Sequence, residues 1–300
     1  MDPRQLFTWL LSPSCTPPAL AVRLATGLLL STAIAWAGAR RRSLSPSGAY
    51  GAVVVGGLIF GLGGWIWGLL LIAFFATSSA LSHYRSAQKQ AVADHFAKTG
   101  RRDLGQVLAN GGVGVILAAW YAATGASQPL LFFAFAGALA AVNADTWATE
   151  LGVLSREEPQ LITSGERVPA GTSGGVSRLG LAAAAAGAWF IGFLGLALQA
   201  LQGVLFVMPW SGRMLWLPLV AGVAGLSGCL VDSLLGATVQ ATYYCTFCGK
   251  ETEQPMHRCG RQPLYVRGWH WLDNDWVNLL ASIAGALVAA FLGSLALYLQ

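Results

Sequence analysis

Eight long apolar runs are the feature that most constrains the fold of this 300-residue chain. Most are close to the roughly 20 residues that a helix needs to cross the hydrocarbon core of a bilayer. The strand alternation of a membrane barrel is absent, and helices are then the structure that satisfies the backbone within lipid. The sequence therefore predicts one all-α domain, a polytopic helical bundle over residues 1–300. The runs cover about 18–39, 48–62, 65–82, 105–124, 129–144, 178–199, 214–238 and 276–298.

Two adjacent runs leave the number of spans open. Residues 48–62 and 65–82 are separated by little more than the glycine-rich stretch 61–64. This spacing predicts either two tilted helices joined by a tight turn or a re-entrant element. Near the N-terminus, run 18–39 lacks a small-residue cleavage site. It therefore predicts a retained span rather than a signal peptide.

The basic residues predict the orientation of the bundle. Only 10% of the residues are charged, against about a quarter in a soluble domain. With eight spans, 15 of the 18 Lys and Arg residues fall in the segments that follow the first, third, fifth and seventh spans. The positive-inside rule then places that side in the cytoplasm and both termini outside. The same bias explains the net charge of +5 without a nucleic-acid partner.

The acids and histidines share this side, which favours an enzyme. All four His residues lie on the predicted cytoplasmic side, and Asp2 is the one acid clearly outside. An enzyme that works at one membrane surface has this one-sided pattern. A transporter more often carries polar groups in both halves, or an inverted repeat. A lipid or ion transporter that uses Asp232 within its span stays the alternative.

Segment 143–150, with the sequence NADTWATE, predicts a magnesium site. As a helix it places Asn143, Thr146 and Glu150 on one stripe and Asp145 on the next. Carboxylates beside an apolar span are costly, which favours a functional role over a solvated helix end. Asp145 and Glu150 are the predicted ligands, because Mg²⁺ prefers one or two carboxylates together with water and phosphate oxygens. Asn143 and Thr146 are expected to assist.

Two glycine-rich stretches predict phosphate binding. Successive glycines let backbone N–H groups approach an anion, and a following helix adds its positive dipole end. Segment 171–177, with the sequence GTSGGVS, precedes the sixth span, which we expect to start near Gly175; the glycines after Asn110 open the fourth span in the same way. A flexible turn with a serine cap is the alternative. The predicted residues are Gly171, Thr172, Ser173, Gly174, Gly175, Ser177 and Arg178, with Asn110, Gly111 and Gly112.

Basic side chains after the third span form another candidate group. Ser82, Arg85 and Lys89 recur at spacings of three and four residues, so they would share one helical face. Such a face could clamp phosphates through Arg85 and Lys89. Ordinary positive-inside charge explains the same residues equally well.

Three more acids are candidate catalytic residues. Asp232 is an ionisable residue inside the seventh span, where structural pairing with an arginine is the alternative to a functional role. Asp273 and Asp275 precede the last span, and capping a helix needs only one of them. The second acid, with Asn278 one turn further on, predicts another metal-binding or phosphate-bridging cluster.

Four soft ligands in segment 239–275, which we interpret as a cytoplasmic loop insert, predict a structural zinc site. Cys245, Cys248, His257 and Cys259 have the spacing Cys-x2-Cys-x8-His-x-Cys. This set suits a tetrahedral Zn²⁺ with no open position for catalysis. A disulfide is disfavoured in the cytoplasm, and ordinary free thiols are the remaining alternative.

Five blocks of sequence resemble the signature motifs of one integral-membrane family. This family includes the phytyl-phosphate kinases of plant and cyanobacterial tocopherol and phylloquinone synthesis. It is distantly similar to CTP-dependent polyprenol kinases and to the cytidylyltransferases that make CDP-diacylglycerol. The likeness extends from about residue 42 to the C-terminus. Its blocks are VLANGG (107–112), NADTWATELG (143–152), GTSGGVSRLG (171–180), DSLLGATVQ (232–240) and LDNDWVN (272–278).

The resemblance implies a kinase that is dependent on a nucleoside triphosphate, with CTP preferred. The implied substrate is a prenyl monophosphate, phytyl phosphate, which becomes the diphosphate at the cytoplasmic face of a plasma or thylakoid membrane. Such a phosphate nucleophile is already anionic, so catalysis would rest on Mg²⁺, basic groups and backbone N–H donors rather than on a general base. A lipid cytidylyltransferase is the main alternative. Zinc is not implied by the resemblance.

Overall fold

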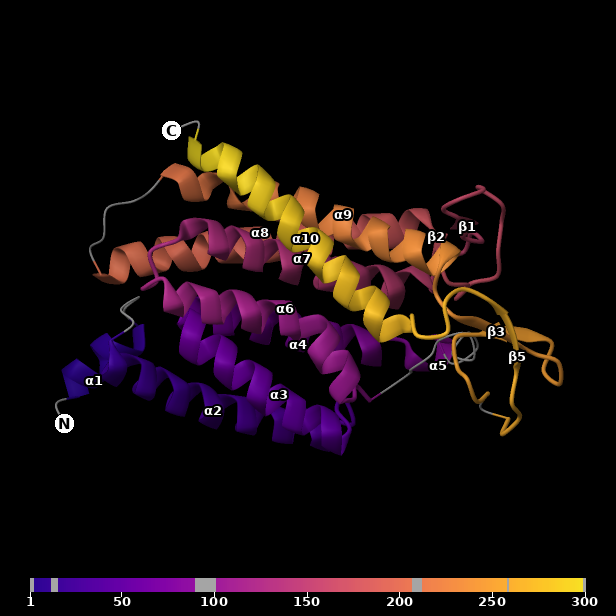
Figure 1. Ribbon diagram of the computed structural model, residues 1–300, viewed down its shortest axis with the longest axis horizontal. Coiled ribbons are helices and arrows are strands. Elements are labelled where there is room, and N and C mark those ends of the chain that lie inside the picture. The colour runs from indigo at the N-terminus through magenta and orange to yellow at the C-terminus, as the bar shows by residue number, and fades with distance from the viewer. Residues whose placement is uncertain (1–2, 12–15, 90–100, 207–211, 258, 299–300) are drawn as a thin grey trace.

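The computed structural model describes residues 3–11, 16–89, 101–206, 212–257 and 259–298, and it confirms a helical membrane bundle (Figure 1). Within these residues, eight helices are long and apolar enough to cross a membrane. They match the eight predicted runs. The spans are α2 (Pro17–Arg40), α3 (Pro46–Leu58) with the π-helical turn η1 (Ile59–Gly63), α4 (Trp65–His83), α6 (Leu104–Ala123), α7 (Pro129–Gly152), α8 (Arg178–Phe206), the 3-10 turn η3 (Gly212–Trp216) with α9 (Leu217–Thr238), and α10 (Asn274–Tyr298). Two shorter helices are α1 (Pro3–Leu11) and α5 (Ser86–Lys89).

The two adjacent runs 48–62 and 65–82 form two separate helices. Gly64 lies between η1 and α4 with φ of 94°, a backbone conformation that favours glycine. The start of α3 and the end of α4 return to the same end of the bundle. There Ser45 N–H donates to Arg102 O (3.0 Å), and Arg102 donates to Ser79 Oγ (3.1 Å). The 18 residues of α3 and η1 rise about 27 Å, close to the thickness of the hydrocarbon core.

Helix α7 lies at the centre of the bundle. Every residue from Leu131 to Ala144 is buried, and the helix contacts α4, α6, α8, α9 and α10. Small residues bring these helices close. A Cβ atom on Gly137 would lie 2.2 Å from the Ala289 side chain of α10, and one on Gly228 of α9 would lie 2.4 Å from that of Ala141. Close approach of this kind replaces the hydrophobic driving force that is missing within lipid.

The polar connections gather at one end of the bundle. Figure 1 shows α5 and the strands at this end, and α1 and the end of α10 at the other. The strands were not predicted, because strands of two to four residues carry almost no periodicity. They are β1 (Gln160–Leu161) paired antiparallel with β2 (Gly175–Val176), and the antiparallel sheet β4-β3-β5 made of β3 (Thr242–Cys245), β4 (Lys250–Thr252) and β5 (Leu264–Arg267).

Candidate active site

A polar cavity opens at the loop end of the bundle. Its volume is about 540 Å³, within the roughly 300–1,000 Å³ of a pocket for a small molecule. Helices α6, α7, α8, α9 and α10 contribute to its wall, together with the loop before α8. The structure thus brings together most of the residues predicted from the sequence. Those that line the cavity are Lys89, Asn110, Asp145, Thr146, Glu150, Gly171, Thr172, Ser173, Gly174, Gly175, Ser177, Asp232 and Asn278.

Two carboxylates on neighbouring helices face this cavity. Asp145 of α7 and Asp232 of α9 are close enough to interact electrostatically with each other. Asp232 Oδ2 is buried, and so is Asn110 Oδ1 on α6, and neither has a hydrogen-bond partner among the described residues. Buried acceptors are normally satisfied, so unpartnered ones beside a second carboxylate suit a hard cation. The donor set therefore fits Mg²⁺, with Asp145 and Asp232 as the residues that would hold it.

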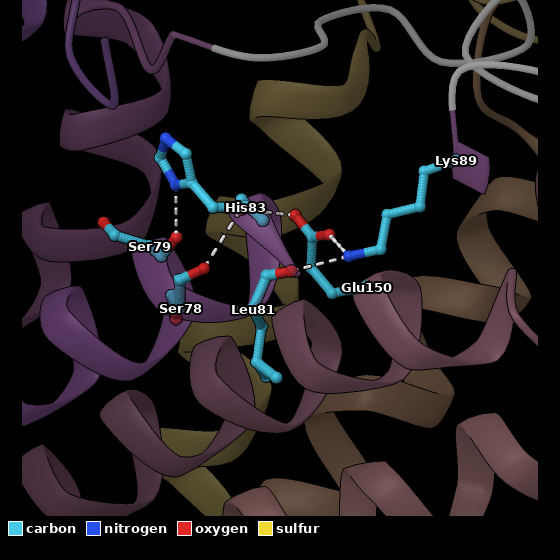
Figure 2. A network of polar contacts seen from close by, with 7 residues as sticks. Ser78, Ser79, Leu81, His83, Lys89 and Glu150 are labelled. Atoms are coloured by element: carbon cyan, nitrogen blue, oxygen red, sulfur yellow. Dashed lines mark hydrogen bonds and ion pairs between the residues drawn. The ribbon is translucent and has the colours of Figure 1, made fainter. Parts of the chain in front are cut away.

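Glu150 already has two partners in this structure. Its Oε2 lies 2.5 Å from Lys89 Nζ, and its Oε1 accepts a hydrogen bond of 2.5 Å from Ser82 Oγ. Lys89 Nζ also donates to Leu81 O at 2.6 Å. Figure 2 shows the Lys89 and Glu150 side chains directed at each other across the end of α4. Glu150 and Lys89, predicted as a metal ligand and a phosphate ligand, therefore form an ion pair at the wall of the cavity.

The predicted shared face of Ser82, Arg85 and Lys89 is wrong. Helix α4 ends at His83, and Arg85 has φ of 49°, so the helical spacing does not continue. Arg85 is exposed, stacks over the Tyr84 ring at 5.3 Å and does not line the cavity. Lys89 reaches the cavity from the separate helix α5.

Arg102 is a basic residue of the site that the sequence did not single out. It lies just before α6 and lines the cavity near Glu150. Burial lowers the pKa of its guanidinium from the usual value, and the charge of Glu150 acts in the opposite direction. No spacing distinguished it from other positive-inside residues, because its role depends on folding beside Ser79.

The loop of residues 171–177 has the conformation that its glycines predict. Gly171 and Gly174 have positive φ angles of 91° and 80°, and a Cβ atom on Gly174 would lie 2.4 Å from that of Ala237. Thr172 and Gly175 use their N–H groups in turns within the loop. Among the described residues, the N–H groups of Ser173 and Gly174 make no backbone hydrogen bond.

Contacts around this loop fix its position. Ser173 Oγ donates to Gln240 Oε1 at 3.1 Å, which joins the loop to the end of α9. Ser177 Oγ accepts from Gly180 N–H at 3.1 Å and so caps α8. The helix begins at Arg178, three residues after the expected start, because Gly175 and Val176 pair with β1.

The second predicted phosphate loop is wrong. Asp103 forms a capping box with Gln106 at the start of α6, so residues 110–112 lie inside the helix. Their N–H groups face the preceding helical turn. Gly111 instead gives Val55 room to approach, since a Cβ atom there would lie 2.5 Å from the valine side chain. Asn110 lines the cavity through its side chain, whereas Gly111 and Gly112 do not.

Two further predictions are corrected by helix contacts. Asn143 is fully buried away from the cavity, and its Nδ2 donates to Gly187 O at 2.7 Å, which joins α7 to α8. Asp273 caps α10, with its Oδ1 accepting from the N–H groups of Asp275 and Trp276 at 3.0 and 3.1 Å. Neither Asp273 nor Asp275 lines the cavity.

Arg178 also lies outside the main cavity. It lines a neighbouring one with a volume of about 480 Å³, together with Arg156 and Arg167. Other cavity-lining residues that sequence reasoning missed come from several elements. They are Gln106, Cys229, Ser233, Gln240, Glu253 and Asn274. Ser233, Gln240 and Asn274 lie in blocks of the resemblance, but nothing in the sequence places Glu253 at the site.

An apolar slot meets the polar cavity. It lies among α2, α3, α4 and α6, with about 80 Å³ of enclosed space and about 740 Å³ of empty space when the open region at its mouth is included. Its walls include Leu30, Val55 and Phe75. Arg102, Gln106 and Asn110 line both the slot and the cavity, so the two spaces share one polar border. This arrangement suits a molecule with an apolar tail and an anionic head.

The fold and cavity define a multi-pass membrane protein with a polar site at one end of its helical bundle. The chain belongs to the family described as integral membrane protein DUF92, whose model matches residues 29–286. Protein PGR of Arabidopsis thaliana is 34% identical over 286 residues, which cover 91% of this chain and 96% of that protein.

Two other relatives have lower sequence identity and match a similar or smaller share of the chain. An uncharacterized membrane protein of Methanocaldococcus jannaschii is 28% identical, over 90% of this chain and 94% of its own. Protein VTE6, chloroplastic, of Arabidopsis thaliana is 26% identical, over 82% of this chain and 64% of its own. No solved structure matches the chain.

Proposed function

We propose that the protein is a Mg²⁺-dependent lipid-phosphate kinase that transfers the γ-phosphoryl group of a nucleoside triphosphate to a prenyl monophosphate. The observation that carries this proposal is the shared border of the two spaces. Arg102, Gln106 and Asn110 lie where an apolar slot meets a polar cavity that holds Asp145 and Asp232. A prenyl tail in the slot would bring its phosphate to this border.

This phosphoryl transfer requires charge neutralisation more than proton transfer. An oxygen of the lipid phosphate attacks the γ-phosphorus, the bond from that phosphorus to the β–γ bridging oxygen breaks, and the nucleoside diphosphate leaves with the electron pair. The attacking oxygen is already anionic, so no general base is needed. A bound Mg²⁺ supplies charge neutralisation on the phosphates.

The chain's own groups have distinct roles in this proposal. Asp145 and Asp232 hold the metal. They come from α7 and α9, which pack against each other and so keep the two carboxylates in place. Ser173 and Gly174 direct their N–H groups at a phosphate of the nucleotide, because these donors are not used elsewhere in the described structure. Arg102 neutralises the lipid phosphate, and Lys89 supports the nucleotide while paired with Glu150.

The substrate rests on the family resemblance. It favours phytyl phosphate as the acceptor and CTP as the donor. A chloroplast location is supported by the relative VTE6, whose name describes it as chloroplastic. A thylakoid or plasma membrane is the proposed location.

The loop end of the bundle is the proposed cytoplasmic face. The Lys and Arg bias predicts this, and it places the nucleotide-binding loop where nucleotide is available. A fusion of alkaline phosphatase to the C-terminus should then be active in a bacterial host, and a fusion of a cytoplasmic fluorescent protein should be dark. The reverse pair of results would overturn the orientation.

Purified full-length protein provides the direct test. It would be incubated with phytyl or farnesyl monophosphate and each of the four nucleoside triphosphates, with and without Mg²⁺. We expect a lipid diphosphate and a nucleoside diphosphate in equal amounts. Release of pyrophosphate with a nucleotide joined to the lipid would instead identify a cytidylyltransferase. Lipid or ion flux in liposomes without nucleotide consumption would identify a transporter.

A further inference from the structure

Three thiols and one imidazole meet beside the β4-β3-β5 sheet. The ligand atoms of Cys245, Cys248, His257 and Cys259 all lie within 4.8 Å of one another. Cys245 ends β3, Cys248 lies in the turn that leads to β4, and the other two lie between β4 and β5. Among the described residues, no other group of three or more His, Cys, Asp or Glu side chains is gathered as closely.

The sulfur–sulfur spacing in this group fits a tetrahedral site. Two sulfurs that are each about 2.3 Å from one zinc ion lie about 3.8 Å apart across a tetrahedron. Cys245 Sγ and Cys259 Sγ are 3.7 Å apart, and His257 Nδ1 lies 3.1 Å from Cys259 Sγ. Cys245 and His257 are buried, at 2% and 3% exposure, whereas large apolar side chains of the same segment, such as Phe247 and Leu264, are exposed.

A disulfide fits the same residues less well. All three thiols are free, and the 3.7 Å between Cys245 and Cys259 sulfurs is far beyond the roughly 2.05 Å of an S–S bond. A disulfide would also leave Cys248 and His257 without a role. Four ligands closed on one ion give each of them a partner and leave no position open for chemistry.

The segment that carries this group also reaches the polar cavity. Glu253 directly follows β4, between Cys248 and His257, and it lines the cavity. It interacts electrostatically with both Asp145 and Asp232. Three carboxylates that repel one another need a fixed backbone to stay together, and the small sheet has no apolar core to supply it.

We propose that Cys245, Cys248, His257 and Cys259 bind one structural Zn²⁺, and that this ion fixes the segment that positions Glu253 beside Asp145 and Asp232. Glu253 then acts as a positioning residue for Asp145 and Asp232, the carboxylates that would hold Mg²⁺. The placement of Glu253 rests on the proposed function, whereas the zinc site does not.

The zinc content of the purified full-length protein tests the proposed zinc site. Elemental analysis should give one zinc per chain without added metal, and a thiol-directed chelator should release it. Cys248→Ser and Cys259→Ser should each lose it, while Cys15→Ser, which changes a thiol outside the described residues, should keep it. Protein free of zinc, or with Cys245 and Cys259 joined in a disulfide, would overturn the site. The measurement on unaltered protein decides this even where the variants fail to fold.

Binding of Mn²⁺ in place of Mg²⁺, measured by electron paramagnetic resonance, tests the proposed role of Glu253. Glu253→Gln should keep its zinc and bind Mn²⁺ roughly 10- to 100-fold more weakly, the loss typical of an outer-shell partner. Cys259→Ser should show the same weakening. Unchanged Mn²⁺ affinity in either variant would overturn the coupling. If unaltered protein bound no Mn²⁺, the proposed magnesium site and the role of Glu253 would both fall, and a measured zinc would stand.

Discussion

Lys89 Nζ lies 2.5 Å from Glu150 Oε2, and the two side chains come from helices that are separated by α6 in the chain. They are 12% and 21% exposed, so the pair is largely shielded from water. It connects the segment after α4 to the end of α7, one helical turn and a half beyond Asp145. The pair therefore links α5 to α7, the helix that carries the proposed metal ligand Asp145.

Removal of one partner should destabilise the protein more than removal of both. Lys89→Met leaves a half-buried carboxylate with Ser82 as its hydrogen-bond partner and only the more distant charge of Arg102, which costs about 1–3 kcal/mol. Glu150→Gln leaves the Lys89 ammonium with the Leu81 carbonyl and no opposite charge. The double variant should recover most of the lost thermal stability and little of the kinase activity. Melting temperatures of the four proteins in one detergent measure this coupling.

A matched control separates the ion pair from the loss of a basic side chain in general. Arg101 is exposed and does not line the cavity, although it lies beside Arg102 in the chain. Arg101→Met should leave both the melting temperature and the activity near those of the parent protein. Additive losses in the Lys89 and Glu150 pair would show that the two residues do not stabilise each other.

Asp145→Asn and Asp232→Asn should each lower kinase activity at least 100-fold. Asparagine keeps the shape of the side chain and removes the charge that holds Mg²⁺, so the folded fraction in size-exclusion chromatography should be unchanged. Glu166→Gln is the control, because Glu166 is exposed and does not line the cavity. Full activity in Asp145→Asn would remove the metal assignment.

The sequence predicted the spans because their signal is long. Runs such as 129–144 are longer than the roughly 3–10 residues of most strands. The proline in the first turn of α2, α3, α7 and α9 is a further helix-start signal that the prediction did not use. The same reasoning failed at Gly111, where a glycine between Asn110 and Gly112 resembles a loop. Within lipid, glycine in a helix serves close packing, and only the neighbour, here Val55, distinguishes the two roles.

The site was predicted in part for a related reason. Asp145 and Asp232 were found because a carboxylate within an apolar run is unusual by itself. Glu253, Arg102 and Gln240 lie in polar segments, where acids, bases and amides are common. Their roles depend on contacts between elements that are distant in sequence, such as Ser173 with Gln240. Local pattern carries no information about such contacts.

Gly174→Ala should weaken nucleotide binding, and Gly112→Ala should not. Gly174 has φ of 80°, which costs an alanine about 1 kcal/mol, and the new Cβ would meet the Ala237 backbone at 2.7 Å. The loop that offers the Ser173 and Gly174 N–H groups would have to move. A Cβ on Gly112 would meet nothing within 4 Å inside α6. The KM for nucleotide, measured for both variants, checks the comparison, and equal values would remove the loop from nucleotide binding.

Ala52→Phe should discriminate between long and short lipid substrates. Ala52 of α3 lines the apolar slot, so the larger ring would exclude the end of a prenyl tail. Two or three CH₂ groups left unburied, at about 0.8 kcal/mol each, weaken binding roughly 10- to 60-fold. The KM for phytyl monophosphate should rise by that factor, while kcat/KM for a five-carbon prenyl monophosphate should stay unchanged. Val54→Phe is the control on the same helix, because Val54 is 54% exposed on the bundle surface and lies outside the slot. Equal effects of the two substitutions on the long substrate would mean that the tail lies elsewhere, and equal effects of Ala52→Phe on both substrates would mean that the ring disturbs the polar cavity instead.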